Sequence, residues 1–157
     1  MKIALIQTGK TNERHVSEGF EVYNSRINKY AGFEVITIPD LKNTRNMLGQ
    51  EQKAKEGNKI LQTVSKDDYL VLLDERGKEL RTAEFAEWLE KRFASSGKRI
   101  VFVIGGPWGF SEEVYSRADF RISLSKMTFP HQLVRLLFAE QLYRAFTIIR
   151  GEPYHHE

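Results

Sequence analysis

The stretch Ser123-Leu124-Ser125-Lys126-Met127-Thr128-Phe129-Pro130-His131-Gln132 decides the fold of this chain. It joins a strand-like segment, 120–124, to a long apolar segment, 130–149, that we expect to be a helix. Strand-to-helix loops of α/β proteins often hold ligands, because free backbone N–H groups and a helix N-terminus face the ligand there. The stretch therefore predicts an α/β protein with a ligand site in this loop.

Strand-like and helical segments alternate along the rest of the chain. Apolar runs that we expect to be strands occupy 3–7, 33–38, 69–73, 100–104 and 120–124. Helices are expected at 51–64, at 84–94, from about residue 111, and in the first connection, where Val16, Phe20, Tyr23, Ile27 and Tyr30 recur at helical spacing. The repeated order of strand and helix predicts an α/β fold, a mostly parallel sheet with helices on both faces, in a single domain over 1–157. The polar segment 39–50 is expected to be a loop.

Composition narrows the class of protein. The 157 residues are 41% hydrophobic and 29% charged, which is typical of a soluble globular domain. No apolar run approaches the roughly 20 residues that span a bilayer. The absence of cysteine excludes disulfides, thiolate metal sites and cysteine nucleophiles. We therefore expect a cytoplasmic protein with no membrane and no metal. The net charge of +3 permits a polyanionic partner but does not by itself indicate one.

The expected last helix, 130–149, is apolar on two sides. One face carries Val134, Phe138, Leu142, Ala145 and Ile149, and a second group lies largely opposite: Leu133, Leu136, Leu137 and Ile148. A surface helix of a monomer is normally apolar on one side only. The helix is thus either buried at the centre of the domain or packed against a second subunit. In so small a domain we favour the subunit interface, and so a homodimer.

Two further loops carry ligand-binding potential. Residues 105–109, Gly-Gly-Pro-Trp-Gly, follow a buried strand, but they match neither a dinucleotide fingerprint nor a phosphate loop. A tight turn and a ligand loop are equally good interpretations of them. Residues 73–78 end the third strand-like run, and alone they indicate only a charged turn. Because the carboxyl ends of parallel strands meet at one edge of a sheet, we expect Leu73, Gly105 and Leu124 to lie close together.

The tail, 150–157, combines cations, an aromatic ring and imidazoles. It is either a frayed terminus or a segment that faces RNA, with Arg150 on a phosphate, Tyr154 stacked on a base and His155 within reach of a proton. The adjacent His155 and His156 are poor metal ligands, since no other His, Asp or Glu has a suitable spacing. Lys126 and His131 leave two interpretations open, catalytic groups or solvated ones.

Several of these segments, taken together, resemble one family. They are 103–109, 123–132, Tyr143-Arg144-Ala145 with the ending Pro153-Tyr154-His155, the opening strand with Gly9-Lys10, and 73–78. Their order and spacing are similar to those of the bacterial ribosomal large-subunit methyltransferase H family, a minimal branch of the SPOUT methyltransferases. The resemblance covers essentially the whole chain and is loosest at 39–50.

The resemblance implies a fold, a cofactor and a reaction. It implies a sheet whose C-terminal part threads a trefoil knot, a homodimer, and N3-methylation of a pseudouridine in 23S rRNA on the assembled 70S ribosome. It also implies that S-adenosylmethionine is held by backbone groups of Leu73, Gly105, Leu124, Ser125, Lys126, Met127, Thr128 and Phe129.

The implied reaction suggests roles for three residues near the C-terminus. The N3–H of a pseudouridine is a weak acid, so a base or a cation that stabilises negative charge would help it leave. Our hypothesis is that His155 or a neighbouring group assists deprotonation, Arg144 steadies the base or a phosphate, and Tyr154 orients the uracil ring. Two alternatives remain at this point. One is a nucleotide-dependent oxidoreductase or hydrolase, supported only by the glycine loop, and the other is a non-enzymatic module that binds the ribosome.

Overall fold

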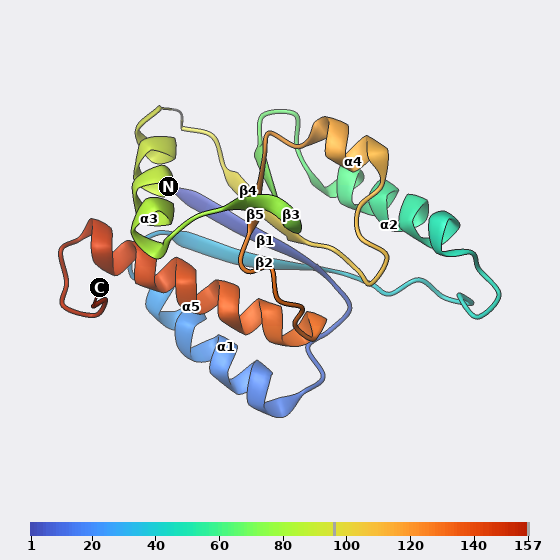
Figure 1. Cartoon of the computed structure of the whole chain (residues 1–157), viewed down its shortest axis with the longest axis horizontal. Coiled ribbons are helices and arrows are strands. Elements are labelled where there is room, and N and C mark those ends of the chain that lie inside the picture. The colour runs from blue at the N-terminus through green and yellow to red at the C-terminus, as the bar shows by residue number, and fades with distance from the viewer. Residues whose placement is uncertain (96, 157) are drawn as a thin grey trace.

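A computed structural model describes residues 1–95 and 97–156, so Glu157, the last residue of the expected tail, lies outside it. In the described part, strands alternate with helices along the whole chain (Figure 1). The elements are β1 Lys2–Thr8, α1 Arg14–Ile27, β2 Gly32–Ile38, α2 Gly49–Thr63, β3 Tyr69–Glu79, α3 Thr82–Ser95, β4 Ile100–Ile104, α4 Glu112–Arg117, β5 Phe120–Ser123 and α5 His131–Ile149. The expected order of elements and the loop before α2 are confirmed.

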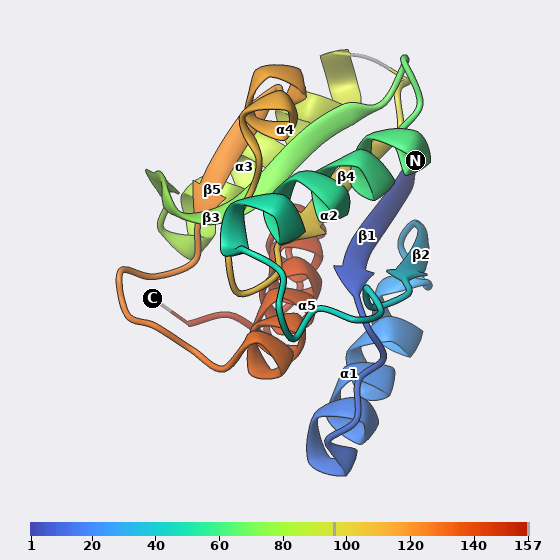
Figure 2. The same cartoon turned by 90° about the vertical axis from the view of Figure 1, so that its right-hand side faces the viewer.

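The strands form one parallel sheet in the order β2-β1-β4-β3-β5. Side chains alternate between its two faces, as the pleat of a strand requires. Ile3 and Leu5 of β1 lie in the core under α1, α3 and α5, whereas Ala4 and Ile6 lie in a second core under α2 and α4. Figure 1 shows the two groups of helices on opposite sides of the sheet, and Figure 2 shows α2 and α4 from the front. The predicted α/β fold is confirmed, and the central strand β4 is apolar throughout because both of its faces are covered.

The third strand is longer than expected. We predicted that it ends at Leu73, but β3 continues to Glu79. Its register against β5 shifts between Leu73 and Lys78, after which Lys78 pairs with Ile122 and Glu79 with Ser123. The charged residues in between do not break the strand, because an irregularity lets them point outward while pairing resumes beyond them. The predicted charged turn at 73–78 is therefore wrong.

Helix α5 lies between α1 and α3 on one face of the sheet (Figure 1). Phe138, Leu142 and Ala145 are fully buried beneath it, as predicted. On its second apolar side, Leu136 packs against Gly19 of α1, where an added Cβ would lie 3.1 Å away. Neighbouring helices thus cover part of that side, and this part of the pattern is explained within one chain.

The first turns of α5 also hold the loop after β1. The buried guanidinium of Arg135 donates to the Thr8 carbonyl at 2.7 Å and to Thr11 Oγ1 at 2.8 Å. The side-chain oxygen of Gln132 accepts from the backbone N–H groups of Asn12 and Glu13, each at 3.0 Å. Because α5 begins directly after the loop 124–130, these contacts fix that loop relative to the end of β1.

A buried ion pair lies at the amino ends of β3 and β4, and it makes the free energy of unfolding depend on pH. The Asp68 carboxylate receives two hydrogen bonds from Arg99, at 2.6 and 3.0 Å. Burial raises the pKa of Asp68, but the hydrogen bonds from Arg99 and from the Ser65 N–H outweigh it, so the pKa lies below the usual 3.8. The contribution of Asp68 to the free energy of unfolding is therefore complete above pH 3.8, the pKa in the unfolded chain. It is lost as the pH falls through the lower pKa of the folded protein.

We expect an Asp68→Asn variant to be less stable than the wild type at neutral pH, because it keeps the shape but loses the charge that Arg99 binds. The difference in free energy of unfolding should stay constant above about pH 5 and shrink below about pH 4. Urea unfolding at a series of pH values measures it. Asp67→Asn, at the exposed neighbouring aspartate, is the matched control. A difference that keeps its size down to pH 3 would contradict the prediction.

Candidate functional site

A cavity of about 630 Å³ lies at the carboxyl ends of β4 and β5 and beside the middle of β3. Its walls come mainly from three segments far apart in the sequence, 73–76, 104–110 and 124–129 without Lys126, and are completed by Lys53, Tyr115, His131 and Val134. Leu73, Gly105 and Leu124 therefore share one site, as the parallel arrangement predicted. The volume lies in the range of about 300–1,000 Å³ that is usual for small-molecule sites.

Polar side chains shape the loops that form this cavity. Ser123 donates to the Ser125 carbonyl at 3.0 Å, and Ser125 Oγ accepts from the Met127 N–H at 2.9 Å, so the loop turns tightly after β5. Across the cavity, the Tyr115 hydroxyl donates to Asp74 at 2.7 Å. Burial, together with this bond, raises the pKa of Tyr115 to about 12, so Tyr115 remains a donor at neutral pH. These bonds hold the loop that follows β5 and tie the middle of β3 to α4.

Seven of the eight predicted cofactor residues line the cavity: Leu73, Gly105, Leu124, Ser125, Met127, Thr128 and Phe129. The eighth, Lys126, does not line it. Its side chain is 83% exposed, and its ammonium lies 3.4 Å from Glu79. The lysine side chain thus points away from the cavity, whereas its backbone remains within the loop.

The cavity combines an apolar surface with charges of both signs, since Lys53 and Arg76 line it as well as Asp74 and Glu75. Its inner surface includes the apolar side chains of Ile104, Phe129 and Val134, and the carboxylates of Asp74 and Glu75 lie on the same wall. An added Cβ at Gly105 would lie 3.0 Å from the ring of Phe110, so a side chain there would press on the wall. A bare backbone at this point lets a ligand approach the loop closely.

Sequence reasoning missed a buried carboxylate behind this loop. Glu56 of α2 is 6% exposed and receives a hydrogen bond from Gln52 at 3.2 Å. Its carboxylate lies so close to Gly106 that an added Cβ there would be 2.6 Å from Glu56 Oε2. The sequence signal for Glu56 is its place on the inward-facing side of a polar helix. Acidic residues are rarely buried there unless they have a partner.

The tail after α5 is folded, not frayed. The helix ends in a turn at Gly151, whose φ of +69° is one that glycine adopts without strain. The Gly151 N–H bonds the Ile148 carbonyl at 3.0 Å and the Glu152 N–H bonds the Thr147 carbonyl at 2.8 Å. This pair of bonds is a Schellman motif, which satisfies the last carbonyls of the helix and turns the chain back.

The three predicted catalytic residues come together around Glu140. Its Oε1 accepts from Arg144 Nε at 2.9 Å and Nη2 at 2.5 Å, and from the Tyr154 hydroxyl at 3.2 Å. The Arg144 guanidinium lies 4.7 Å from the centre of the Tyr154 ring, and its Nη1 lies 3.3 Å from Nδ1 of His155. We call Glu140, Arg144, Tyr154 and His155 the tail cluster. Glu140 was missed as a site residue, although its position four residues before Arg144 on an apolar helix is the signal that points to it.

The tail cluster can donate hydrogen bonds and stabilise negative charge. Burial, the hydrogen bond with Tyr23 and the charge of Glu140 raise the pKa of Tyr154 to about 12, so its hydroxyl stays protonated. The hydrogen bond to Glu140 likewise raises the pKa of Arg144, and its cation is permanent. An arginine only donates, so its contact with His155 is a hydrogen bond when Nδ1 carries no proton.

A smaller cavity of about 280 Å³ connects the two groups of residues. It is lined by Glu140 and Gln141 and also by Leu73, Leu124 and Phe129, which line the larger cavity as well. Arg144 lies ten residues beyond Val134 on α5, which is about 15 Å along the helix axis. The tail cluster and the ligand cavity are therefore neighbours along one helix.

The structure describes residues 1–95 and 97–156 of the chain. No group of three or more His, Asp or Glu side chains in this part of the chain is arranged to hold a metal ion. Within the same residues, no helix combines the length and the apolar character needed to cross a membrane.

Known proteins resemble this chain over its whole length. A family profile described as "Predicted SPOUT methyltransferase" matches residues 1–155. The ribosomal RNA large subunit methyltransferase H of Christiangramia forsetii is 54% identical over 156 residues, which is 99% of either chain. The protein of the same name from Parabacteroides distasonis is 53% identical over the full length of both. Among solved structures, the tRNA (m1G37) methyltransferase from Aquifex aeolicus aligns with a TM-score of 0.57 at 16% identity, covering all of this chain and 76% of the other, which is a likeness of fold.

Proposed function

Because the chain belongs to the SPOUT methyltransferase family, within the group of ribosomal RNA large subunit methyltransferase H, we propose that it methylates N3 of a pseudouridine in 23S rRNA on the assembled 70S ribosome. Its cofactor is S-adenosylmethionine, as in the family. The observation that carries the proposal is the adjacency of a loop-lined cavity and the tail cluster along α5. Membership in a methyltransferase family argues against both alternatives, the oxidoreductase or hydrolase and the non-enzymatic module.

The large cavity fits the cofactor. Its apolar walls suit an adenine ring and a thioether chain, and a lining that carries both carboxylates (Asp74, Glu75) and cations (Lys53, Arg76) suits a ligand with charges of both signs. We propose that the loops of Leu73, Gly105 and 124–129 hold it through backbone groups. When bound there, S-adenosylmethionine supplies an electrophilic methyl group on its sulfonium sulfur.

The tail cluster prepares the acceptor nitrogen. We propose that the Tyr154 hydroxyl donates to a uracil carbonyl and holds the ring in line with the cavity. Arg144 lies beside the ring and stabilises the negative charge that spreads over the uracil oxygens as N3 loses its proton. Glu140 holds both donors in place through the bonds described above.

His155 is the proposed acceptor of the N3 proton. In the structure its Nδ1 lies against the Arg144 guanidinium. We propose that the bound uracil displaces the Arg144 Nη1 contact while Glu140 keeps Nε and Nη2, which leaves Nδ1 of His155 able to take the proton from N3. His155 would release this proton to solvent after methyl transfer.

A homodimer and a knot complete the proposal. On α5, Leu133 and Leu137 are half-buried and lie in line with Glu140 and Arg144, which favours a second copy across this face. Such a copy would also extend the surface that recognises the ribosome. For the knot, support comes from membership of the SPOUT family. Under force, a knotted chain tightens, so its unfolded length in optical tweezers should fall short of the full contour length.

The proposal is tested by transfer of labelled methyl from S-adenosylmethionine to 70S ribosomes that lack the modification, with free 23S rRNA in parallel. Nucleoside mass spectrometry then identifies the product. We expect N3-methylpseudouridine with 70S ribosomes and far less with free rRNA, because a chain of net charge +3 has little general affinity for RNA. Binding of S-adenosylhomocysteine without methyl transfer to either RNA would agree with membership in the methyltransferase family but refute the proposed substrate.

A further inference from the structure

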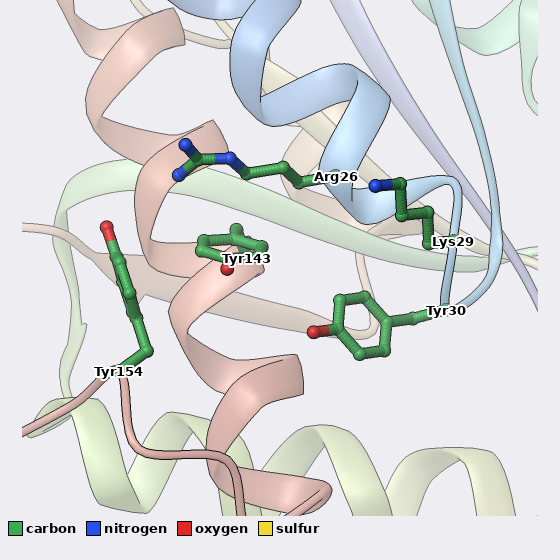
Figure 3. Close-up of a pocket in the computed structure, with 5 residues that line it drawn as sticks. All are labelled: Arg26, Lys29, Tyr30, Tyr143 and Tyr154. Atoms are coloured by element: carbon green, nitrogen blue, oxygen red, sulfur yellow. The ribbon is translucent and has the colours of Figure 1, made fainter.

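A recess of about 430 Å³ opens between the C-terminal end of α1, the second half of α5 and the tail. It is lined by Arg26, Lys29, Tyr30, Tyr143 and Tyr154 (Figure 3). Figure 3 shows the two cationic side chains on one side of the recess and the tyrosine rings on the other. Only Tyr154 belongs to the tail cluster, and none of the five lines the cofactor cavity.

The recess carries positive charge that the described residues do not neutralise by ion pairs. Arg26 and Lys29 are exposed, and neither forms an ion pair in the part of the chain that the structure describes. The same holds for Arg150, whose guanidinium lies 5.8 Å from the ring centre of Tyr30. Two carboxylates of the described residues contact the lining: Glu140, through Tyr154, and Glu152, which accepts from the Tyr30 hydroxyl at 2.7 Å. An anionic ligand would find at least two cations available.

The tyrosine rings are held in fixed positions. Tyr30 is stacked on Phe146, with ring centres 5.4 Å apart and planes at 3°. Tyr143 meets Tyr154 edge to face at 4.8 Å, and the Arg26 guanidinium lies 5.3 Å from the Tyr143 ring centre. Fixed aromatic rings and guanidinium planes beside unpaired cations are the groups on which proteins stack the bases of single-stranded RNA.

We propose that this recess binds a nucleotide of the RNA substrate that neighbours the target base. Arg26 and Lys29 hold its phosphate, and the base lies against Tyr30 and Tyr143. Because Tyr154 belongs both to the recess and to the tail cluster, this nucleotide lies directly beside the one that reacts. The inference rests on the proposed function for the identity of the RNA, and on the recess alone for the class of ligand.

A double variant, Arg26→Gln with Lys29→Gln, tests the proposal. Its matched control is Arg14→Gln with Lys55→Gln, which removes the same charge at exposed residues that are paired with Glu18 and Glu51. We expect the KM for 70S ribosomes to rise about tenfold or more in the recess variant only. The slope of log affinity against log salt should fall by about one to two, since each lost phosphate contact removes roughly 0.7. Affinity for S-adenosylhomocysteine should stay unchanged.

Two results would overturn the proposal. One is an unchanged KM and salt slope in the recess variant. The other is a change in the molar mass of the protein, measured by light scattering, because the recess would then be a contact between copies of the chain. A Tyr30→Phe variant, which keeps the ring, should retain the wild-type KM, whereas Tyr30→Ala should raise it.

A binding assay separates this inference from the proposed function. Fluorescence anisotropy with a labelled short oligouridylate measures RNA binding without methyl transfer. One outcome is that the wild type methylates no ribosome while the recess variant still loses affinity for this RNA relative to the control. That result would support RNA binding by the recess and refute the proposed substrate. If the wild type methylates 70S ribosomes and the recess and control variants bind and react alike, the proposed function is supported and RNA binding by the recess is refuted.

Discussion

An Arg144→Ala variant is expected to methylate 70S ribosomes about 100- to 1,000-fold more slowly than the wild type, which is the usual effect of removing one donor that stabilises developing negative charge. Arg144 touches every other member of the tail cluster, through Glu140 at 2.5 Å, the Tyr154 ring at 4.7 Å and His155 at 3.3 Å. Its removal therefore takes away the cation and loosens the two groups beside it. The loss should appear in kcat, because the contact with uracil is strongest in the transition state.

Ligand binding at the larger cavity, the proposed cofactor site, is the internal control for the Arg144→Ala variant. Arg144 does not line it, so the affinity for S-adenosylhomocysteine should equal that of the wild type. Arg14→Ala, which breaks an exposed pair with Glu18 of the same i,i+4 spacing, should leave both turnover and affinity unchanged. Arg144→Lys should recover only part of the rate, since an ammonium cannot make the forked contact with Glu140. Turnover of Arg144→Ala within threefold of the wild type would refute the role of Arg144 in the reaction.

The same assay examines His155. If His155 accepts the N3 proton, His155→Ala should lower kcat by about 100-fold at neutral pH, and the loss should shrink as the pH rises and solvent base takes over. Full turnover by this variant would remove the assignment of a base to His155 and leave Arg144 as the group that promotes loss of the proton.

Sequence reasoning reached the ligand cavity because it depended on connectivity. Parallel strands end at one edge of a sheet, so Leu73, Gly105 and Leu124 had to be neighbours once the alternation of strand and helix was recognised. The direction of the Lys126 side chain could not be obtained in this way. It is set by the turn that Ser123 and Ser125 impose, and that turn depends on two hydrogen bonds within the loop.

The residues that the sequence did not reveal are those defined by tertiary contact. Glu140 looked like an ordinary charge on α5 until Tyr154 was seen to fold back onto it. The five residues of the recess come from α1, α5 and the segments that follow them, and no local pattern links Arg26 to Tyr143. The extension of β3 was missed for the opposite reason. A run of charges usually ends a strand, and only the pairing with β5 overrides that preference.

Gly77 lies within that extension, and Gly77→Ala should destabilise the protein by about 3 kcal/mol, at the upper end of the usual cost of overpacking. An added Cβ would stand 2.8 Å from the carbonyl carbons of Arg121 and Ile122 and from the Ile122 nitrogen. All three are backbone atoms of β5, which cannot rotate away as a side chain does. The two strands would have to separate where their pairing resumes at Lys78 and Ile122.

The loss of stability should reach the cofactor cavity, because β3 leads from the Leu73 wall and β5 leads into the loop 124–129. We expect weaker binding of S-adenosylhomocysteine as well as a lower urea midpoint. Gly97→Ala is the matched control, since an added Cβ there meets no atom within 4 Å and should change neither quantity. Equal midpoints for the two variants would show that β3 and β5 can move apart at Gly77 without cost.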